Sequence, residues 1–123
     1  MAGELILVVE DNEKNRKLVR DVLTFKGYQI IEAETGEDGV RLAKERLPKL
    51  VLMDIQLPGI DGIEALRRIR SDDTTRAIPV LAVTASAMDR DRQTIMAAGF
   101  DGYQSKPLNL KEFLAAVEAI LRR

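Results

Sequence analysis

Three short, wholly apolar runs constrain the fold of this chain more than any other feature of its sequence. They occupy Leu5–Val9, Leu50–Met53 and Pro79–Val83, and each ends at a polar residue. Apolar runs of this length, with no polar residue alternating along them, are typical of strands that are buried on both faces of a sheet. Two less apolar segments, 29–33 and 102–105, are predicted to be further strands nearer the edges of the sheet.

Each predicted strand is followed by a segment whose apolar residues recur at helical spacing. Residues that cap helix N-termini precede four of these segments. The expected caps are Asn12 or Asp11, Thr35 with Asp38, Asp61 with Glu64, and Asn109 with Glu112. The second helix is expected to include Leu47 in its apolar stripe and to be closed by Pro48. Five strands that alternate with five helices predict an α/β fold with a parallel sheet, in which ligands bind beyond the carboxyl ends of the strands.

Composition excludes several kinds of chemistry. The 123 residues include neither cysteine nor histidine, which excludes disulfides, thiolate metal sites and nucleophiles activated by histidine. The net charge is −1 with both signs interspersed, so electrostatics gives no reason to expect direct nucleic-acid binding. No apolar stretch reaches membrane-spanning length, and the N-terminus lacks the pattern of a signal peptide. We therefore expect a cytoplasmic protein without membrane contact, built as one domain over residues 1–123.

Polar side chains suited to chemistry stand at the ends of four of the five predicted strands. Glu10 and Asp11 follow the first strand, Asp54 the third, Thr84 ends the fourth and Lys106 follows the fifth. Each residue alone has an ordinary explanation, since Asp54 could start a turn and the Glu10–Asp11 pair could cap a helix. Because the carboxyl ends of parallel strands meet at one edge of a sheet, we expect these side chains to lie together, which favours a shared chemical role.

A cluster of three carboxylates requires positive charge nearby. Two unit charges about 4 Å apart repel by roughly 4 kcal/mol at an effective dielectric of 20. Lys106 supplies one positive charge. A hard divalent cation such as Mg²⁺, which prefers carboxylate oxygens and water as ligands, would supply more. A carboxylate nucleophile, a hard cation, a lysine and a hydroxyl are the groups that phosphoryl transfer requires, so the sequence favours Asp54 as a phosphoryl acceptor.

Four motifs, in this order and spacing, resemble the receiver domains of two-component response regulators. They are Val8–Asn12, Leu52–Gly62, Val83–Ala85 and Tyr103–Pro107, and the match covers essentially the full length. The chain is most similar to short single-domain regulators and to the receivers of phosphorelays. The resemblance implies a flavodoxin-like (βα)5 sandwich with parallel strand order 2-1-3-4-5. It also implies a regulator without an output domain, which signals to a downstream protein through its fourth helix, fifth strand and fifth helix.

The resemblance implies how the acceptor and the metal are held. Asp54 would take the phosphoryl group from a phosphohistidine of a histidine kinase or phosphotransfer protein. Glu10, Asp11, Asp54 and the backbone carbonyl of Gln56 would hold Mg²⁺, with Mn²⁺ as an alternative. The side chains of Gln56 and Ser86 would influence the lifetime of the phosphoryl group. The family most often has a second aspartate where this chain has Glu10, so we expect the longer side chain to reach the metal through water or a flexed rotamer.

The remaining motif residues are implied to sense the phosphoryl group. Lys106, Thr84 and Ala85 would contact its oxygens, and a cis bond between Lys106 and Pro107 would fix the loop. Tyr103 would be an aromatic switch that packs inward when Thr84 moves toward the phosphoryl group.

Several alternatives stay open. The chain could be a receiver cut from a longer hybrid kinase or transcription factor, and it could form a phosphorylation-dependent dimer. A phosphohydrolase of the haloacid dehalogenase type also uses an aspartyl nucleophile, but its acid/base carboxylate would fall at Gln56. A flavin carrier of the same fold is disfavoured, because the acidic residues after the first strand would repel a flavin phosphate and aromatic residues make up only 4% of the chain. We expect a signalling domain whose only chemistry is its own phosphorylation and dephosphorylation.

Overall fold

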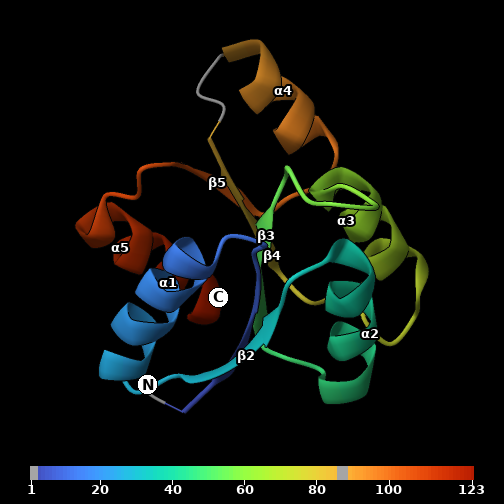
Figure 1. Cartoon of the computed structure of the whole chain (residues 1–123). Coiled ribbons are helices and arrows are strands. Elements are labelled where there is room, and N and C mark those ends of the chain that lie inside the picture. The colour runs from blue at the N-terminus through green and yellow to red at the C-terminus, as the bar shows by residue number, and fades with distance from the viewer. Residues whose placement is uncertain (1–2, 86–88) are drawn as a thin grey trace.

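The computed structural model describes residues 3–85 and 89–123. The five strands form one parallel sheet in the order β2-β1-β3-β4-β5 (Figure 1). The predicted alternation of strands and helices and the predicted strand order are both confirmed. In chain order the elements are β1 (Leu5–Val9), α1 (Glu13–Phe25), β2 (Gln29–Ala33), α2 (Gly36–Arg46), β3 (Leu50–Asp54), α3 (Gly62–Ser71), β4 (Val80–Thr84), α4 (Asp89–Ala97), β5 (Gly102–Ser105) and α5 (Leu110–Leu121).

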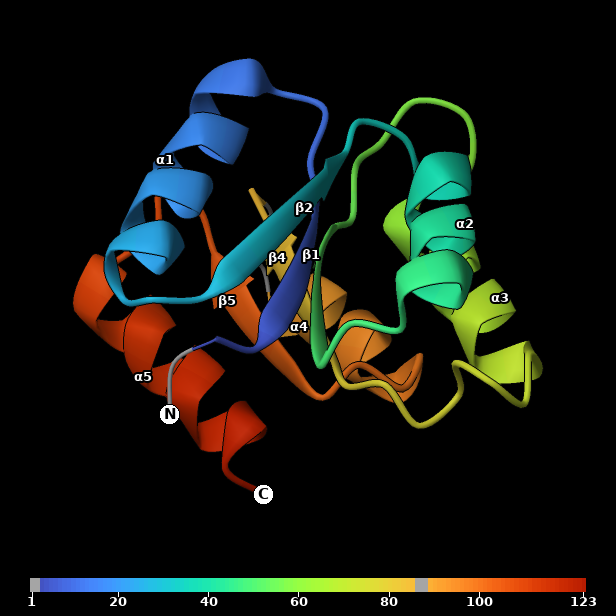
Figure 2. The ribbon, with the colours of Figure 1, turned by 90° about the horizontal axis from the view of Figure 1, so that it is seen from below.

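The sheet is the middle layer of three, with helices on both faces (Figure 2). Helices α1 and α5 pack on one face, and α2, α3 and α4 contribute to the core on the other. Successive residues of a strand point to opposite faces, so Leu7 and Val9 of β1 join the core under α2, while Ile6 and Val8 join the core under α1. Burial on both faces is the reason why the central strands are apolar without interruption.

The predicted helix caps are confirmed. In each case a side-chain oxygen accepts a hydrogen bond from a backbone N–H three residues later, which satisfies one of the N–H groups left free at a helix start. The pairs are Asn12 with Asn15 at 3.0 Å, Thr35 with Asp38 at 3.1 Å, Asp61 with Glu64 at 2.8 Å, and Asn109 with Glu112 at 3.1 Å. Because these caps fix where α1, α2, α3 and α5 begin, they also fix the loops that leave β1, β2, β3 and β5.

The prediction for the end of α2 is wrong at one residue. The helix ends at Arg46, and Leu47 adopts a left-handed conformation with φ of 47° instead of joining the apolar stripe. Leu47 precedes Pro48, and the residue before a proline is disfavoured in the right-handed helical region. Its side chain is consequently 52% exposed.

Candidate functional site

The strand register brings four of the predicted site residues to one edge of the sheet. The register pairs Val9 with Met53, Asp54 with Val83, and Thr84 with Ser105. Glu10, Asp54, Thr84 and Lys106 therefore stand at or directly beyond consecutive strand ends. The strand order reverses between β1 and β3, which is where open α/β sheets form their ligand crevices.

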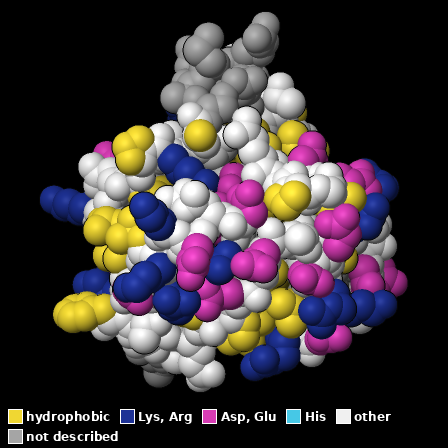
Figure 3. All heavy atoms as spheres, in the orientation of Figure 1, with side chains coloured by type: hydrophobic (Ala, Val, Ile, Leu, Met, Phe, Trp, Pro, Cys, Tyr) yellow, Lys and Arg dark blue, Asp and Glu magenta, His cyan; other side chains and the backbone are white. Residues whose placement is uncertain are grey.

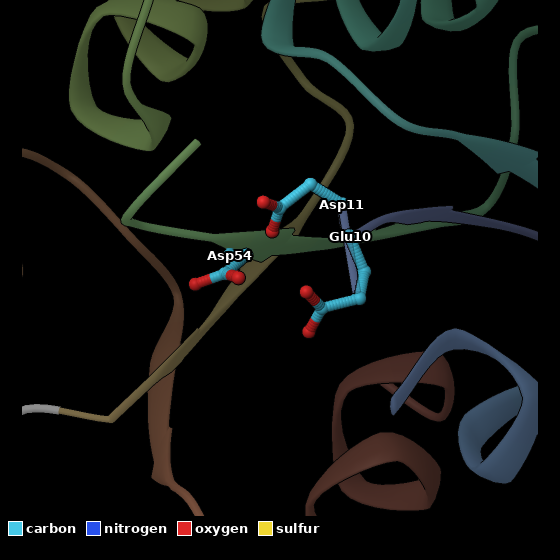
Figure 4. Close-up of side chains that lie close together, drawn as sticks. All are labelled: Glu10, Asp11 and Asp54. Carbon is cyan, nitrogen blue, oxygen red and sulfur yellow. The ribbon is translucent and has the colours of Figure 1, made fainter. Parts of the chain in front are cut away.

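Three carboxylates gather at this edge. Glu10, Asp11 and Asp54 each offer one oxygen, and these oxygens lie within 4.8 Å of one another. Figure 4 shows the three side chains directed toward one another from the ends of β1 and β3. Glu10 and Asp54 are buried, whereas Asp11 is exposed, so the cluster has a closed side and a side open to solvent. Hard oxygen ligands in this arrangement suit a divalent cation such as Mg²⁺.

Lys106 contacts both buried carboxylates. Its Nζ atom lies 2.6 Å from Oε1 of Glu10 and 3.0 Å from Oδ2 of Asp54. Burial is the largest single influence on the pKa of Lys106 and acts to lower it. The hydrogen bonds and charges of Asp54 and Glu10 together outweigh burial, so the pKa lies above the ordinary lysine value. Lys106 therefore stays charged at neutral pH, and the peptide bond that links it to Pro107 is cis.

Backbone N–H groups hold the other oxygens of the two buried carboxylates. The N–H of Asn12 donates to Oε2 of Glu10 at 3.0 Å, and the N–H of Gln56 donates to Oδ1 of Asp54 at 3.2 Å. The side chain of Glu10 is one methylene longer than that of an aspartate, and its carboxylate is bound at both oxygens, by Asn12 and by Lys106. These contacts fix the longer side chain beside Asp54.

The remaining predicted residues lie around this cluster at different depths. Thr84 is buried, with 1% of its surface exposed, and its carbonyl accepts a hydrogen bond of 2.8 Å from the N–H of Lys106. Ala85 and Gln56 are exposed, and Ser86 lies outside the described residues. Tyr103 is partly buried against the core under α2, α3 and α4.

Two residues that sequence reasoning did not assign to the site contact its backbone. A Cβ added to Gly62 would overlap the carbonyl oxygen of Asp54 and lie 2.8 Å from the Cα of Ile55, so α3 begins against the end of β3. Arg16 of α1 donates from Nη1 to the carbonyl oxygen of Glu10 at 3.0 Å. The helix-start signal of Asp61 with Glu64 gave no role to Gly62, and nothing in the linear sequence connects Arg16 to Glu10.

Comparison with known proteins decides which family shares this arrangement. The model of the response regulator receiver domain matches residues 6–118. The chain belongs to the response regulator receiver family. This receiver is 42% identical over 116 residues to the polar-differentiation response regulator DivK of Brucella anthropi, with 94% of each chain covered. It is accordingly a response regulator of two-component phosphorelay signalling, as its motifs predicted.

Solved structures support the same assignment of the receiver. The receiver domain of the sensor histidine kinase PA1611 from Pseudomonas aeruginosa PAO1 is 34% identical, with a TM-score of 0.92 over 99% of this chain and 100% of that one. That domain has a magnesium ion coordinated in its active-site cleft. A two-component response regulator of the LuxR family from Aurantimonas sp. SI85-9A1 is 33% identical, with a TM-score of 0.89 over 98% of this chain and 86% of that one.

Proposed function

We propose that Asp54 of this receiver accepts a phosphoryl group from a phosphohistidine of a histidine kinase or phosphotransfer protein. The observation that carries the proposal is that Asp54 lies in a carboxylate cluster and also contacts an ammonium group. Its carboxylate lies beside those of Glu10 and Asp11, and the Lys106 ammonium is 3.0 Å from one of its oxygens. An acceptor needs a carboxylate oxygen and a fixed positive charge beside it, and the Lys106 ammonium supplies that charge to Asp54.

The oxygen ligands fit a magnesium ion. Three carboxylates and one ammonium leave an excess of two negative charges, three minus one, which a divalent cation balances. Glu10, Asp11, Asp54 and the backbone carbonyl of Gln56 would hold the ion, and Mn²⁺ takes similar oxygen ligands. When bound, the ion would help to neutralise the oxygens of the transferring phosphoryl group. The magnesium ion in the cleft of the related PA1611 receiver supports this assignment.

The transfer would exchange one bond to phosphorus for another. One Asp54 oxygen forms a bond to phosphorus while the phosphorus–nitrogen bond of the donor breaks, and the electron pair of that bond leaves with the imidazole. Lys106 is already charged and within reach of Asp54, so it would pair with the phosphoryl oxygens without first gaining a proton. Thr84 and Ala85, at the end of β4, would provide further contacts to these oxygens.

Phosphorylation would change the surface formed by α4, β5 and α5. A phosphoryl group adds about −1.5 to −2 charge and three acceptor oxygens, which would draw Thr84 toward the site. Tyr103, on the neighbouring strand, would then pack farther inward. The guanidinium carbon of Arg92 in α4 lies 5.6 Å from the centre of the Tyr103 ring, so a movement of the ring would change this cation–π contact with α4. Gln56 and Ser86 would tune how long this state lasts.

In this proposal, the domain signals by contacting another protein and does not catalyse the turnover of an external substrate. Acidic and basic side chains lie interspersed among apolar ones on the face seen in Figure 3, which supports a protein rather than a nucleic-acid partner. Within residues 3–85 and 89–123, no helix combines the length and the apolar character needed to cross a membrane. The proposal includes a cytoplasmic location and a dimer that forms on phosphorylation.

Intact-protein mass spectrometry after incubation with acetyl phosphate tests the acceptor. We expect the mass of one phosphoryl group to be added in the presence of Mg²⁺, and to be absent with a chelator or in the variants Asp54→Asn and Asp54→Ala. Asp73→Asn is the matched control, because Asp73 is an exposed carboxylate with 88% of its side chain accessible. Modification that persists in both Asp54 variants would overturn the assignment.

A further inference from the structure

Arg16 connects the carboxylate cluster to β2, the strand whose end places no side chain in that cluster. Its guanidinium contacts three residues, one at the end of β1 and two at the end of β2. Nη1 donates to the carbonyl oxygen of Glu10 at 3.0 Å, Nε donates to Oε1 of Glu32 at 3.1 Å, and Nη2 lies 3.2 Å from Oε1 of Glu34. Only 13% of the Arg16 side chain is exposed, so its contacts with the Glu10 carbonyl and with Glu32 are shielded from solvent more than those of a surface ion pair, whereas the Glu34 side chain is 70% exposed.

The contact from Arg16 completes the fixation of the Glu10 backbone. The N–H of Glu10 donates to the carbonyl of Ala33 at 3.0 Å, and its carbonyl accepts from Arg16. The carbonyl of Glu10 and the N–H of Asp11 belong to one planar peptide group. Arg16 therefore sets the orientation of the peptide from which the exposed Asp11 side chain departs.

We propose that Arg16 is a positioning residue for metal binding. It holds the Glu10–Asp11 peptide in the orientation in which both carboxylates face Asp54, while Glu32 and Glu34 fix the guanidinium. This role rests on the proposed function, because the cluster must bind a metal ion for the orientation to matter. An arginine is required, since a planar group with five N–H donors can reach three acceptors at once and a lysine ammonium on a flexible stem cannot hold the same geometry.

Isothermal titration of the unphosphorylated protein with Mg²⁺ measures this role. We expect Arg16→Gln to weaken the affinity for Mg²⁺ about 10-fold, the lower end of the effect seen when residues that orient metal ligands are removed. Arg16→Lys should fall between the wild type and Arg16→Gln. Arg20→Gln is the matched control, because Arg20 pairs with the same Glu32 at 3.1 Å but lies one helical turn farther along α1 and is 40% exposed. It should bind Mg²⁺ like the wild type.

A second measurement needs neither metal nor phosphorylation. In ¹H–¹⁵N spectra of the metal-free protein, the amide resonance of Asp11 should shift in Arg16→Gln and stay in place in Arg20→Gln, because only the first variant removes the hydrogen bond on that peptide group. A role of Arg16 limited to the stability of α1 would not single out this amide. Circular dichroism establishes that each variant is folded. If Arg16→Gln does not fold, the Mg²⁺ titration and the Asp11 amide shift are measured in the two single variants Arg16→Lys and Glu34→Gln instead.

The outcomes separate this inference from the proposed function. Wild-type affinity for Mg²⁺ in a folded Arg16→Gln protein overturns the role of Arg16 and leaves the proposed function intact. Equal losses in Arg16→Gln and Arg20→Gln also overturn it, because they would point to the shared Glu32 pairing instead of the Glu10 carbonyl. A wild-type protein that binds no Mg²⁺ overturns the proposed metal site and this inference with it.

Discussion

At the scale of single residues, Lys106 has the clearest electrostatic role among the side chains of the site. It is bound by two buried carboxylates, Glu10 and Asp54, which would otherwise repel each other without compensation. Burial is the largest single influence on its pKa and lowers it. The hydrogen bonds and charges of the two carboxylates raise the pKa, and their combined effect is larger than that of burial. The net direction is upward, so the folded state binds the proton of Lys106 more tightly than the unfolded chain does.

The raised pKa of Lys106 predicts a specific dependence of stability on pH. A lysine with a higher pKa in the folded state contributes its full stabilisation below the unfolded pKa of about 10.4 and loses it as pH rises through the folded value. We expect Lys106→Met to unfold at lower urea concentration than the wild type at pH 7 to 9, and the difference to narrow above pH 10.

The exposed Lys111 provides the control for this titration, because Lys111→Met removes the same charge from α5 without touching the carboxylates. Urea unfolding followed by circular dichroism at a series of pH values measures both variants. A difference between Lys106→Met and the wild type that keeps the same size up to pH 11 would contradict the linkage.

At the scale of elements, the junction of β3 and α3 places Asp54. The N–H of Gly62, the first residue of α3, donates to the carbonyl of Ile55 at 2.8 Å. The absence of a Cβ at Gly62 allows this close approach, because an added Cβ would overlap the Asp54 carbonyl oxygen. The start of α3 and the backbone of the proposed acceptor are therefore packed directly against each other.

This packing predicts the sign of the effect of Gly62→Ala. Helix propensity alone would make alanine more stable than glycine by up to about 1 kcal/mol. Overlap with backbone atoms that cannot move aside should instead destabilise the protein by about 1–3 kcal/mol, the usual range for overpacking. Urea unfolding at neutral pH decides between the two signs, and a variant as stable as the wild type or more stable would contradict the close approach.

Some features of the strands and helices can be predicted from the sequence, and others depend on how these elements pack. The ends of three strands were predictable, because an apolar run that stops at a polar residue marks its own boundary, and this was enough to place Glu10, Asp54 and Thr84 at one edge of the sheet. Lys106 follows the less apolar β5, whose end no such run marks. The prediction that Leu47 belongs to α2 was wrong, because the helical spacing of apolar residues continues to Leu47 although the helix already ends at Arg46, two residues before Pro48. The contact of Arg16 with the Glu10 carbonyl depends on how α1 packs beside β2, which no local pattern encodes.

At the scale of the whole molecule, the site depends on the complete sheet. Its side chains come from β1, β3, β4 and β5 and the loops that follow them, and β2 supports it through the ion pairs of Arg16. An unfolded chain would not hold Glu10, Asp11 and Asp54 together, because more than 40 residues separate the first two from the third. Metal binding and folding should therefore be coupled.

This coupling predicts opposite effects of one substitution with and without metal. Mg²⁺ at about 100 times its dissociation constant should raise the free energy of unfolding of the wild type by about 2.7 kcal/mol, because it binds the folded state alone. Asp11→Asn removes one negative charge from the cluster, so it should be at least as stable as the wild type in chelator. It should also lose most of the gain that Mg²⁺ gives.

Thermal and urea unfolding with Mg²⁺ or with chelator measure both effects, and Asp73→Asn, which removes an exposed charge elsewhere, should respond to Mg²⁺ like the wild type. An equal gain from Mg²⁺ in Asp11→Asn and the wild type would place the bound ion outside the carboxylate cluster. Lower stability of Asp11→Asn in chelator would show that the metal-free fold gains from the third carboxylate instead of tolerating its repulsion. The predicted pattern is that Asp11→Asn is at least as stable as the wild type in chelator and gains less stability from Mg²⁺. This pattern follows if the carboxylate cluster binds a cation that balances its negative charge.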